Sequence, residues 1–97
     1  ISMKGYWIVR SHVYDQEEFL KYLEISQSIV EKFSGCFLIR GGKQLEKETT
    51  GYERTVVVEF PDFNTAKECY ESSEYQTALG HINKSAKRTV AIVEGLT

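Results

Sequence analysis

Apolar residues recur along the chain with two different spacings, and the change of spacing predicts its secondary structure. Amphipathic helices repeat apolar positions every three or four residues, and residues 15–35 and 63–79 do so. Strands are rich in β-branched and aromatic residues. Four segments have that composition: residues 5–13, 36–45, 53–60 and 89–94. The predicted order of elements is therefore β-α-β-β-α-β.

Capping residues predict where the first helix begins and ends. Asp15 and Glu18 form a capping signature, because the aspartate accepts free amide hydrogens of the first turn while the glutamate reaches back. Gly35 is expected to end the helix by adopting a positive φ. The side chains that share one stripe and predict its core-facing side are Phe19, Tyr22, Leu23, Ser26, Ile29, Val30 and Phe33.

The second helical region follows the third strand through a sharp corner. Pro61 stops the strand, and Asp62 can cap a helix over residues 63–71. A further helical turn from Ser72 is expected to break at Gly80, which leaves an irregular segment before the last strand.

The β-α-β-β-α-β order is that of the ferredoxin-like split βαβ unit. This is an α+β fold whose four-stranded antiparallel sheet carries its helices on one face. The 97 residues suffice for one modest core, so residues 1–97 are expected to form a single ferredoxin-like domain. Ile1 and Ser2 precede Met3 and are interpreted as additions to the native sequence.

The first, third and fourth strands carry apolar side chains on both of their faces. Helices on one side of the sheet can cover only one of these faces. We therefore expect a homodimer that forms through the open face of the sheet.

The hairpin of the second and third strands has two possible registers, which assign the side chains to the two faces of the sheet differently. We choose the register that keeps one face wholly apolar. That face comprises Phe37, Ile39, Val56, Val58 and Phe60. On this choice Arg40 and Glu59 project together from the other face and pair across the strands. Two charged groups in apolar strands are interpreted either as a salt bridge that sets the dimer register or as part of a ligand site.

Composition and charge exclude several classes of protein. The net charge is -2, with Lys+Arg 12 against Asp+Glu 14, and no long run of one sign occurs, so nucleic acid is not an expected partner. No apolar stretch is long enough to cross a membrane and no signal peptide precedes the domain, so we expect a cytoplasmic protein. Cys36 and Cys69 lack the spacing of a metal or redox motif and are expected to be buried thiols.

Candidate chemistry is sparse, and the catalytic residues stay unassigned. The sequence contains no nucleophile elbow, phosphate-binding glycine loop or metal motif, and no cofactor or metal is expected. A ligand site, if present, is expected to be a partly apolar pocket in each protomer, in which a lone arginine favours a small carboxylate or enolate. For the candidate tyrosines and histidines of this chain, core packing or solvent contact is a commoner role than ligand binding or catalysis. The candidate ligand-binding residues are Trp7, His12, Arg40, Glu59, Tyr70 and Tyr75.

Several pieces spread over nearly the whole chain resemble the domain-of-unknown-function 1330 family. These pieces are Lys4-Gly5-Tyr6-Trp7, Phe37-Leu38-Ile39-Arg40-Gly41-Gly42, Arg54, Val56-Val57-Val58-Glu59-Phe60-Pro61, Ala66, Tyr70, Ser72, Glu74-Tyr75-Gln76 and Val93-Glu94-Gly95. The resemblance implies a dimeric α/β barrel, in which two ferredoxin-like protomers pack sheet against sheet, and a family without an assigned activity. Its wider superfamily includes cofactor-free monooxygenases, muconolactone isomerases and haem enzymes.

The chain departs from the family pattern in its second helical region. Cys69 stands where the family usually has a bulky aromatic residue, and Ser73 stands where it often has proline. The family tends to carry an arginine one or two turns later, where this chain has His81, Ile82 and Lys84. We therefore do not assign the anion-binding role of that arginine to any residue of this chain.

Three functions from different classes remain open. The first is a binding protein that holds a small apolar or aromatic carboxylate in a cleft of each protomer. The second is a cofactor-independent monooxygenase or isomerase, in which His12, Glu59 or a tyrosine moves a proton. The third is a structural dimerisation module without chemistry, because a fold alone does not decide function.

Overall fold

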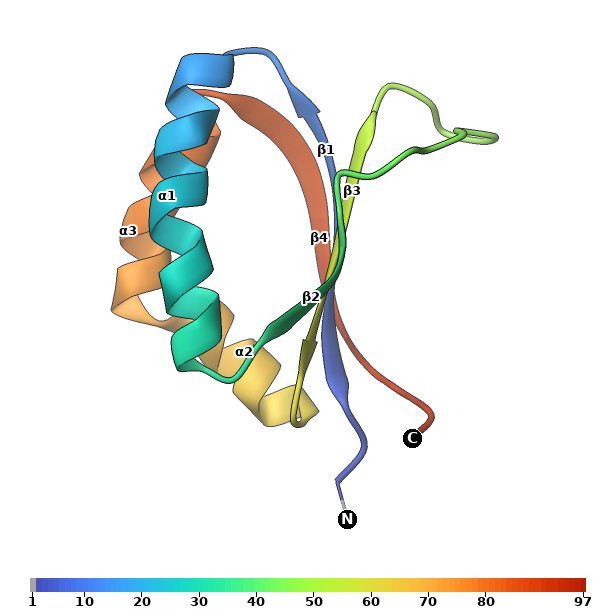
Figure 1. The fold of residues 1–97 in the computed structure, drawn as a ribbon, viewed down its shortest axis with the longest axis vertical. Helices are drawn as coiled ribbons and strands as arrows, with labels where there is room; N and C mark the ends of the chain where they lie inside the picture. Colours follow the sequence, from blue (N-terminus) through green and yellow to red (C-terminus); the bar gives the residue numbers. More distant parts are fainter. Residues whose placement is uncertain (1) are drawn as a thin grey trace.

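A computed structural model describes residues 2–97, which form one antiparallel sheet with its helices on one face (Figure 1). The strands are β1 (Gly5–Val13), β2 (Cys36–Arg40), β3 (Arg54–Phe60) and β4 (Ala86–Glu94), and the helices are α1 (Gln16–Lys32), α2 (Phe63–Glu71) and α3 (Ser73–Asn83). The predicted ferredoxin-like order is confirmed, with the second helical region divided into α2 and α3. Ile1, one of the two residues interpreted as additions, lies outside the described residues.

The sheet has the strand order β2-β3-β1-β4, so β1 pairs with both of its neighbours along its length. Alternate residues of β1 face the helices, and Trp7, Val9 and Ser11 are buried there. Trp7 lies opposite Val58 of β3 and Ile92 of β4. The core therefore forms between this side of the sheet and α1, α2 and α3.

The beginning of α1 follows the sequence prediction, whereas its end does not. The amide of Glu18 donates to Oδ1 of Asp15 at 3.1 Å, which confirms the N-terminal cap. At the other end Ser34 adopts the positive φ, 62°, that we expected at Gly35. Gly35 is required for a different reason, because a Cβ there would lie 2.5 Å from Cγ1 of Val30 and 2.9 Å from Cε1 of Phe60.

The second helical region continues further than its glycine suggests. The amide of Thr65 donates to Oδ1 of Asp62 at 2.7 Å, so α2 begins at the predicted cap. Ser72 ends α2 and caps α3. The predicted break at Gly80 is wrong, because α3 runs to Asn83. Burial of Ile82 in the core stabilises the last turn of α3 against the weak helix propensity of glycine.

A bulge in β2 overturns the register that we predicted for the hairpin. Phe37 pairs with Val58 but Ile39 pairs with Val57, so one extra residue is inserted at Leu38. Beyond the bulge Arg40 lies opposite Val56 on the helix-facing side, and Ile39 moves to the open side. The predicted Arg40–Glu59 pair is therefore wrong, since Glu59 lies opposite Cys36. The strand also ends at Arg40 instead of passing through the two glycines.

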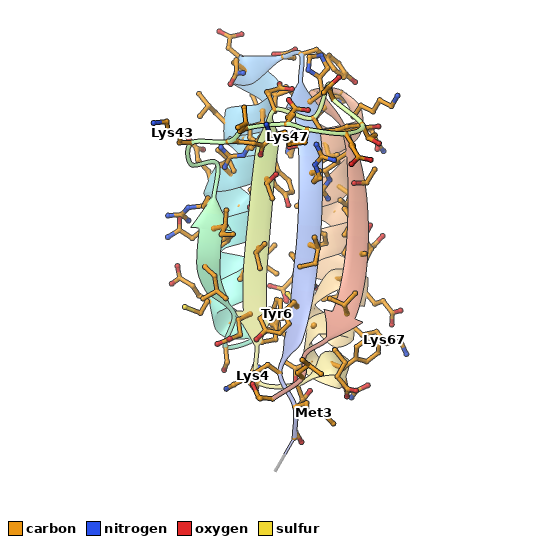
Figure 2. All side chains as sticks on the ribbon, turned by 90° about the vertical axis from the view of Figure 1, so that its right-hand side faces the viewer. Met3, Lys4, Tyr6, Lys43, Lys47 and Lys67 are labelled. Atoms are coloured by element: carbon orange, nitrogen blue, oxygen red, sulfur yellow. The ribbon has the colours of Figure 1, made fainter. Side chains whose placement is uncertain are left out.

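The open face of the sheet carries both polar and apolar side chains (Figure 2). Tyr6 projects from it and donates a hydrogen bond of 3.1 Å to Glu59. Ile8, Ile39 and Val93 are 36%, 47% and 40% exposed, which is a large exposure for such side chains in strands. No helix or strand among residues 2–97 covers this face, but the loop between β2 and β3 projects from it near one end, where Glu46 of the loop pairs with Arg10 of β1 (Figure 1, Figure 2).

The two cysteines differ in environment. Cys69 is fully buried in α2, and burial raises the pKa of its thiol to about 12. Cys36 is exposed, so the expectation of buried thiols is wrong for this residue. None of the helices between residues 2 and 97 has the length and apolar character needed to span a bilayer.

Substitution of Gly35, which follows α1, and of Gly80, which lies within α3, tests the packing at the end of α1. Gly35→Ala should lower the free energy of unfolding by about 2 kcal/mol, because its methyl group collides with Val30 and Phe60. Gly80→Ala is the matched control, since a Cβ there meets no atom within 4 Å, and it should raise stability by about 0.5–1 kcal/mol. Urea denaturation measures both changes, and equal effects of the two substitutions would contradict the packing role of Gly35.

Candidate functional site

A cavity of about 220 Å³ lies between α1 and the helix-facing side of the sheet. Trp7 and Val9 of β1, Val56 and Val58 of β3, and Phe19 of α1 contribute apolar walls. The volume is slightly below the roughly 300–1,000 Å³ of pockets for drug-sized ligands, so the cavity suits a smaller molecule.

Three arginines from three strands line the same cavity, namely Arg40 of β2, Arg54 of β3 and Arg88 of β4. None of the ion pairs formed within residues 2–97 involves any of them. Arg54 and Arg88 are half-buried, whereas Arg40 is on the edge strand and is more exposed. The cavity thus combines apolar walls with positive charge that no carboxylate of the described chain neutralises.

The strand register sets two of these arginines beside one serine. Ser11 of β1 lies opposite Arg54 on one side and opposite Arg88 on the other, and all three line the cavity. Adjacent strands are about 4.8 Å apart, so the three side chains form a row across the sheet. We call this the Arg54–Ser11–Arg88 row. It places an arginine on either side of a buried serine, which is 2% exposed.

Aromatic rings hold the guanidinium groups in place. The guanidinium carbon lies 5.4 Å from the ring centre of Phe19 for Arg54 and 4.6 Å from that of Phe37 for Arg40. Arg40 also donates a hydrogen bond of 3.3 Å to Oε1 of Gln27 on α1. These contacts orient the donors without neutralising their charge.

The electrostatics of the site favour a bound anion. Burial lowers the pKa of Arg54, and the nearby charge of Arg40 lowers it further. Each of these effects disfavours the charged guanidinium, yet arginine stays protonated in proteins. A bound anion would relieve both effects, because it supplies opposite charge where none is present in the chain.

Arg88 is part of a hydrogen-bonded group with two tyrosines. Its Nη2 donates to the hydroxyl of Tyr75 at 2.8 Å and its Nη1 to the hydroxyl of Tyr22 at 3.3 Å. The two hydroxyl oxygens are 2.6 Å apart. Burial acts to lower the pKa of Arg88, but the tyrosine hydroxyls outweigh it and raise that pKa above its usual value. Burial raises the pKa of Tyr75, so both residues keep their protons at neutral pH.

Four of the six residues proposed from the sequence lie in or behind this cavity. Trp7 and Arg40 line it directly, and Nε1 of Trp7 donates to the carbonyl oxygen of Ala66 at 2.8 Å. Tyr75 and Tyr70 pack against Trp7, with ring centres 4.9 and 5.9 Å from it. The tyrosines therefore support the wall at Trp7 from the side of α2 and α3.

The other two proposed residues are on the opposite face of the sheet. Nδ1 of His12 is 3.0 Å from Glu53, and Glu59 accepts the hydrogen bond from Tyr6. The sheet separates both residues from the cavity. The structure does not bring Glu59 or His12 together with Arg40.

Sequence reasoning missed six polar residues of the cavity wall, namely Ser11, Tyr22, Ser26, Gln27, Arg54 and Arg88. Strand alternation carried a usable signal for the arginines, because Arg54 precedes Val56 and Arg88 precedes Val90 by two positions. The predicted last strand began at residue 89, one position too late to include Arg88. The observed β4 begins at Ala86.

No group of three or more histidine, cysteine, aspartate or glutamate side chains between residues 2 and 97 could hold a metal ion. The described polar groups of the cavity are hydroxyls, an amide and guanidinium groups. These are the donors that recognise oxygen atoms of anions.

Comparison with known proteins relates the chain to one family. The model of the family described as "Domain of unknown function (DUF1330)" matches residues 4–96. No curated protein matches the chain at a significant level.

Solved structures share the fold at low sequence identity. A protein of unknown function from Rhodopseudomonas palustris is 13% identical with a TM-score of 0.75, and the match covers 100% of this chain and 85% of that one. SnoaB, a cofactor-independent oxygenase from Streptomyces nogalater, is 8% identical with a TM-score of 0.70, over 99% and 96% of the two chains. A dimeric ferredoxin-like protein of unknown function from Jannaschia sp. CCS1 is 14% identical with a TM-score of 0.69, over 95% and 99%.

Removal of one cavity arginine should make the protein more stable. Arg54→Met should raise the free energy of unfolding by about 0.5 kcal/mol, because it deletes a half-buried charge that another arginine repels. Urea denaturation at low ionic strength measures this change. Arg10→Met is the control, since Arg10 forms an ion pair with Glu46, and it should leave stability unchanged or lower it. A loss of stability in Arg54→Met larger than that in Arg10→Met would contradict uncompensated charge in the cavity.

Proposed function

The chain belongs to the DUF1330 family, and we propose that it binds a small organic anion in the cavity of each protomer. The anion carries a carboxylate or enolate oxygen and an apolar or aromatic body. The observation that supports this function is the set of three arginines without ion-pair partners, which lines an otherwise largely apolar cavity.

The proposed ligand places its charge at the row formed by Arg54, Ser11 and Arg88. Guanidinium groups bind carboxylates through two parallel hydrogen bonds, and the serine hydroxyl supplies a further donor. The apolar body of the ligand lies against Trp7 and Phe19, where it replaces water. Arg40, on the edge strand β2, closes the outer side of the cavity.

We further propose that the protein is a homodimer formed through the open face of the sheet. Ile8 and Val93 are exposed on neighbouring strands of that face, and Ile39 is exposed on the edge strand. Burial of such side chains between two copies would remove them from water. The Jannaschia protein is described as dimeric, which supports a dimeric state for this chain.

An enzyme of the cofactor-independent oxygenase or isomerase kind is the second candidate. The observation that favours it is the hydroxyl of Tyr22, a cavity residue that accepts a hydrogen bond from Arg88, because a hydroxyl polarised in this way can stabilise an enolate oxygen. His12 and Glu59, the other groups proposed to move a proton, are separated from the cavity by the sheet. Turnover of the bound anion in air without added cofactor distinguishes this candidate from a binding protein.

A structural module without ligand is the third candidate, and it gives no reason for the cavity arginines. Dimerisation through the open face does not require charged groups on the helix-facing side of the sheet. Failure of the protein to bind any small carboxylate would favour this candidate.

Ligand binding should depend on charge at the cavity and not on the opposite face. Benzoate and phenylacetate should raise the melting temperature of the parent, whereas benzyl alcohol should not. Arg54→Met and Arg40→Met should each weaken binding about tenfold or more, because a charge-assisted hydrogen bond contributes roughly 1.5–3 kcal/mol. Isothermal titration calorimetry measures the dissociation constants.

The matched controls for this experiment lie on the open face. Glu59→Gln and His12→Gln should bind benzoate as tightly as the parent, since neither residue lines the cavity. If the arginine variants bind as tightly as these controls, the proposed site is wrong.

Dimer formation should depend on the open face and not on the helical layer. Ile8→Asp should dissociate the dimer into monomers at micromolar concentration, because it would bury an unpaired carboxylate in the interface. Leu20→Asp is the control on α1, where the side chain is 55% exposed, and it should remain dimeric. Sedimentation velocity measures both states, and a parent protein that is monomeric at micromolar concentration would contradict the proposal.

A further inference from the structure

Tyr22 lines the cavity, and its hydroxyl belongs to the hydrogen-bonded group around Arg88. The two tyrosine oxygens are 2.6 Å apart, and either hydroxyl can be the donor on distance alone. The number of hydrogens and acceptors in the group decides between the two arrangements.

Arg88 has only donors, so it can accept a hydrogen from neither tyrosine. Tyr75 is 1% exposed, and its oxygen has two partners in the described chain, the guanidinium of Arg88 and the oxygen of Tyr22. The hydrogen of Tyr75 can therefore go only to Tyr22. In the reverse arrangement that hydrogen would be buried without an acceptor, which native structures avoid. Burial also raises the pKa of Tyr75, so this hydrogen is retained.

The oxygen of Tyr22 then accepts two hydrogen bonds, one from Tyr75 and one from the charged Arg88. Its own hydrogen is left for the cavity, because Tyr75 is no longer available as an acceptor. We propose that Tyr22 is the ligand-facing hydrogen-bond donor of the cavity, and that it donates to an anionic oxygen of the bound molecule. This inference rests on the proposed function and assigns one of its contacts.

The environment of Tyr22 favours a carboxylate or enolate oxygen over a neutral acceptor. Accepted hydrogen bonds polarise a hydroxyl and strengthen the bond that it donates. The charge of Arg88 lies 5.3 Å from the centre of the Tyr22 ring. Arg54 lines the same cavity as Tyr22 and has no ion-pair partner among residues 2–97. An anionic oxygen at Tyr22 is therefore attracted by both arginines.

Two variants that delete the same hydrogen bond test the inference. Tyr22→Phe and Tyr75→Phe each remove one partner of the 2.6 Å contact, but only Tyr22→Phe removes the hydroxyl that faces the cavity. Benzoate is the probe, and isothermal titration calorimetry gives its dissociation constant. Tyr22→Phe should weaken benzoate binding about tenfold. Tyr75→Phe should weaken it by no more than about threefold, because the Tyr22 hydroxyl in that variant still donates to benzoate. Equal losses in the two variants would overturn the role of Tyr22, because they would reflect the shared hydrogen bond.

The same titrations separate failure of this inference from failure of the proposed function. If the parent binds benzoate, Arg54→Met does not, and the two tyrosine variants lose affinity equally, then the anion site stands and the role of Tyr22 falls. If neither benzoate nor phenylacetate binds the parent, both proposals fall.

Proton NMR of the parent gives a second test that needs no variant to fold. Benzoate should move the hydroxyl resonance of Tyr22 downfield and leave that of Tyr75 nearly unchanged. A downfield shift confined to Tyr75 would show that the hydrogen bond runs the other way and would overturn the inference.

Discussion

The register of β1 against its two neighbours is the constraint on which the candidate site depends. Ser11 pairs with Arg54 on β3 and with Arg88 on β4, so one pairing pattern brings two distant arginines to the same end of the cavity. A slip of one residue in either strand would turn that arginine to the open face. The burial of Trp7 against Val58 fixes the same register, because it requires the apolar residues of β1 and β3 to face the helices together. Core packing and the site thus depend on one alignment.

The site lowers the stability of the fold that positions it. Half-buried guanidinium groups lose hydration, and the chain provides hydroxyls, an amide and aromatic rings as their contacts instead of carboxylates. The acidic residues that form ion pairs, Glu18, Glu46, Glu53 and Glu74, pair with other cations. A protein that needed only its fold would gain stability from apolar residues at these positions. The proposed anion would account for the positive charge retained in this apolar cavity.

Local signals in the sequence predicted most elements, and they failed where tertiary contacts decide. Asp15, Asp62 and Ser72 predicted helix starts because a cap acts within one turn. The bulge at Leu38 has no local signature beyond the nearby glycines, yet it moved Arg40 to the cavity and separated it from Glu59. Gly80 did not end α3, because burial of Ile82 outweighs its propensity. Arg88 was missed through a strand boundary that was three residues late.

Direct observation of the arginine side chains tests the central claim that the cavity is an anion site. In a protein labelled with ¹⁵N, the Nε–H resonances of Arg40, Arg54 and Arg88 should shift together as benzoate is added, with one common dissociation constant. The resonance of Arg10, which is paired with Glu46 on the open face, should stay in place. Shifts of similar size at Arg10 and at the cavity arginines, or no shift at any of them, would contradict the account.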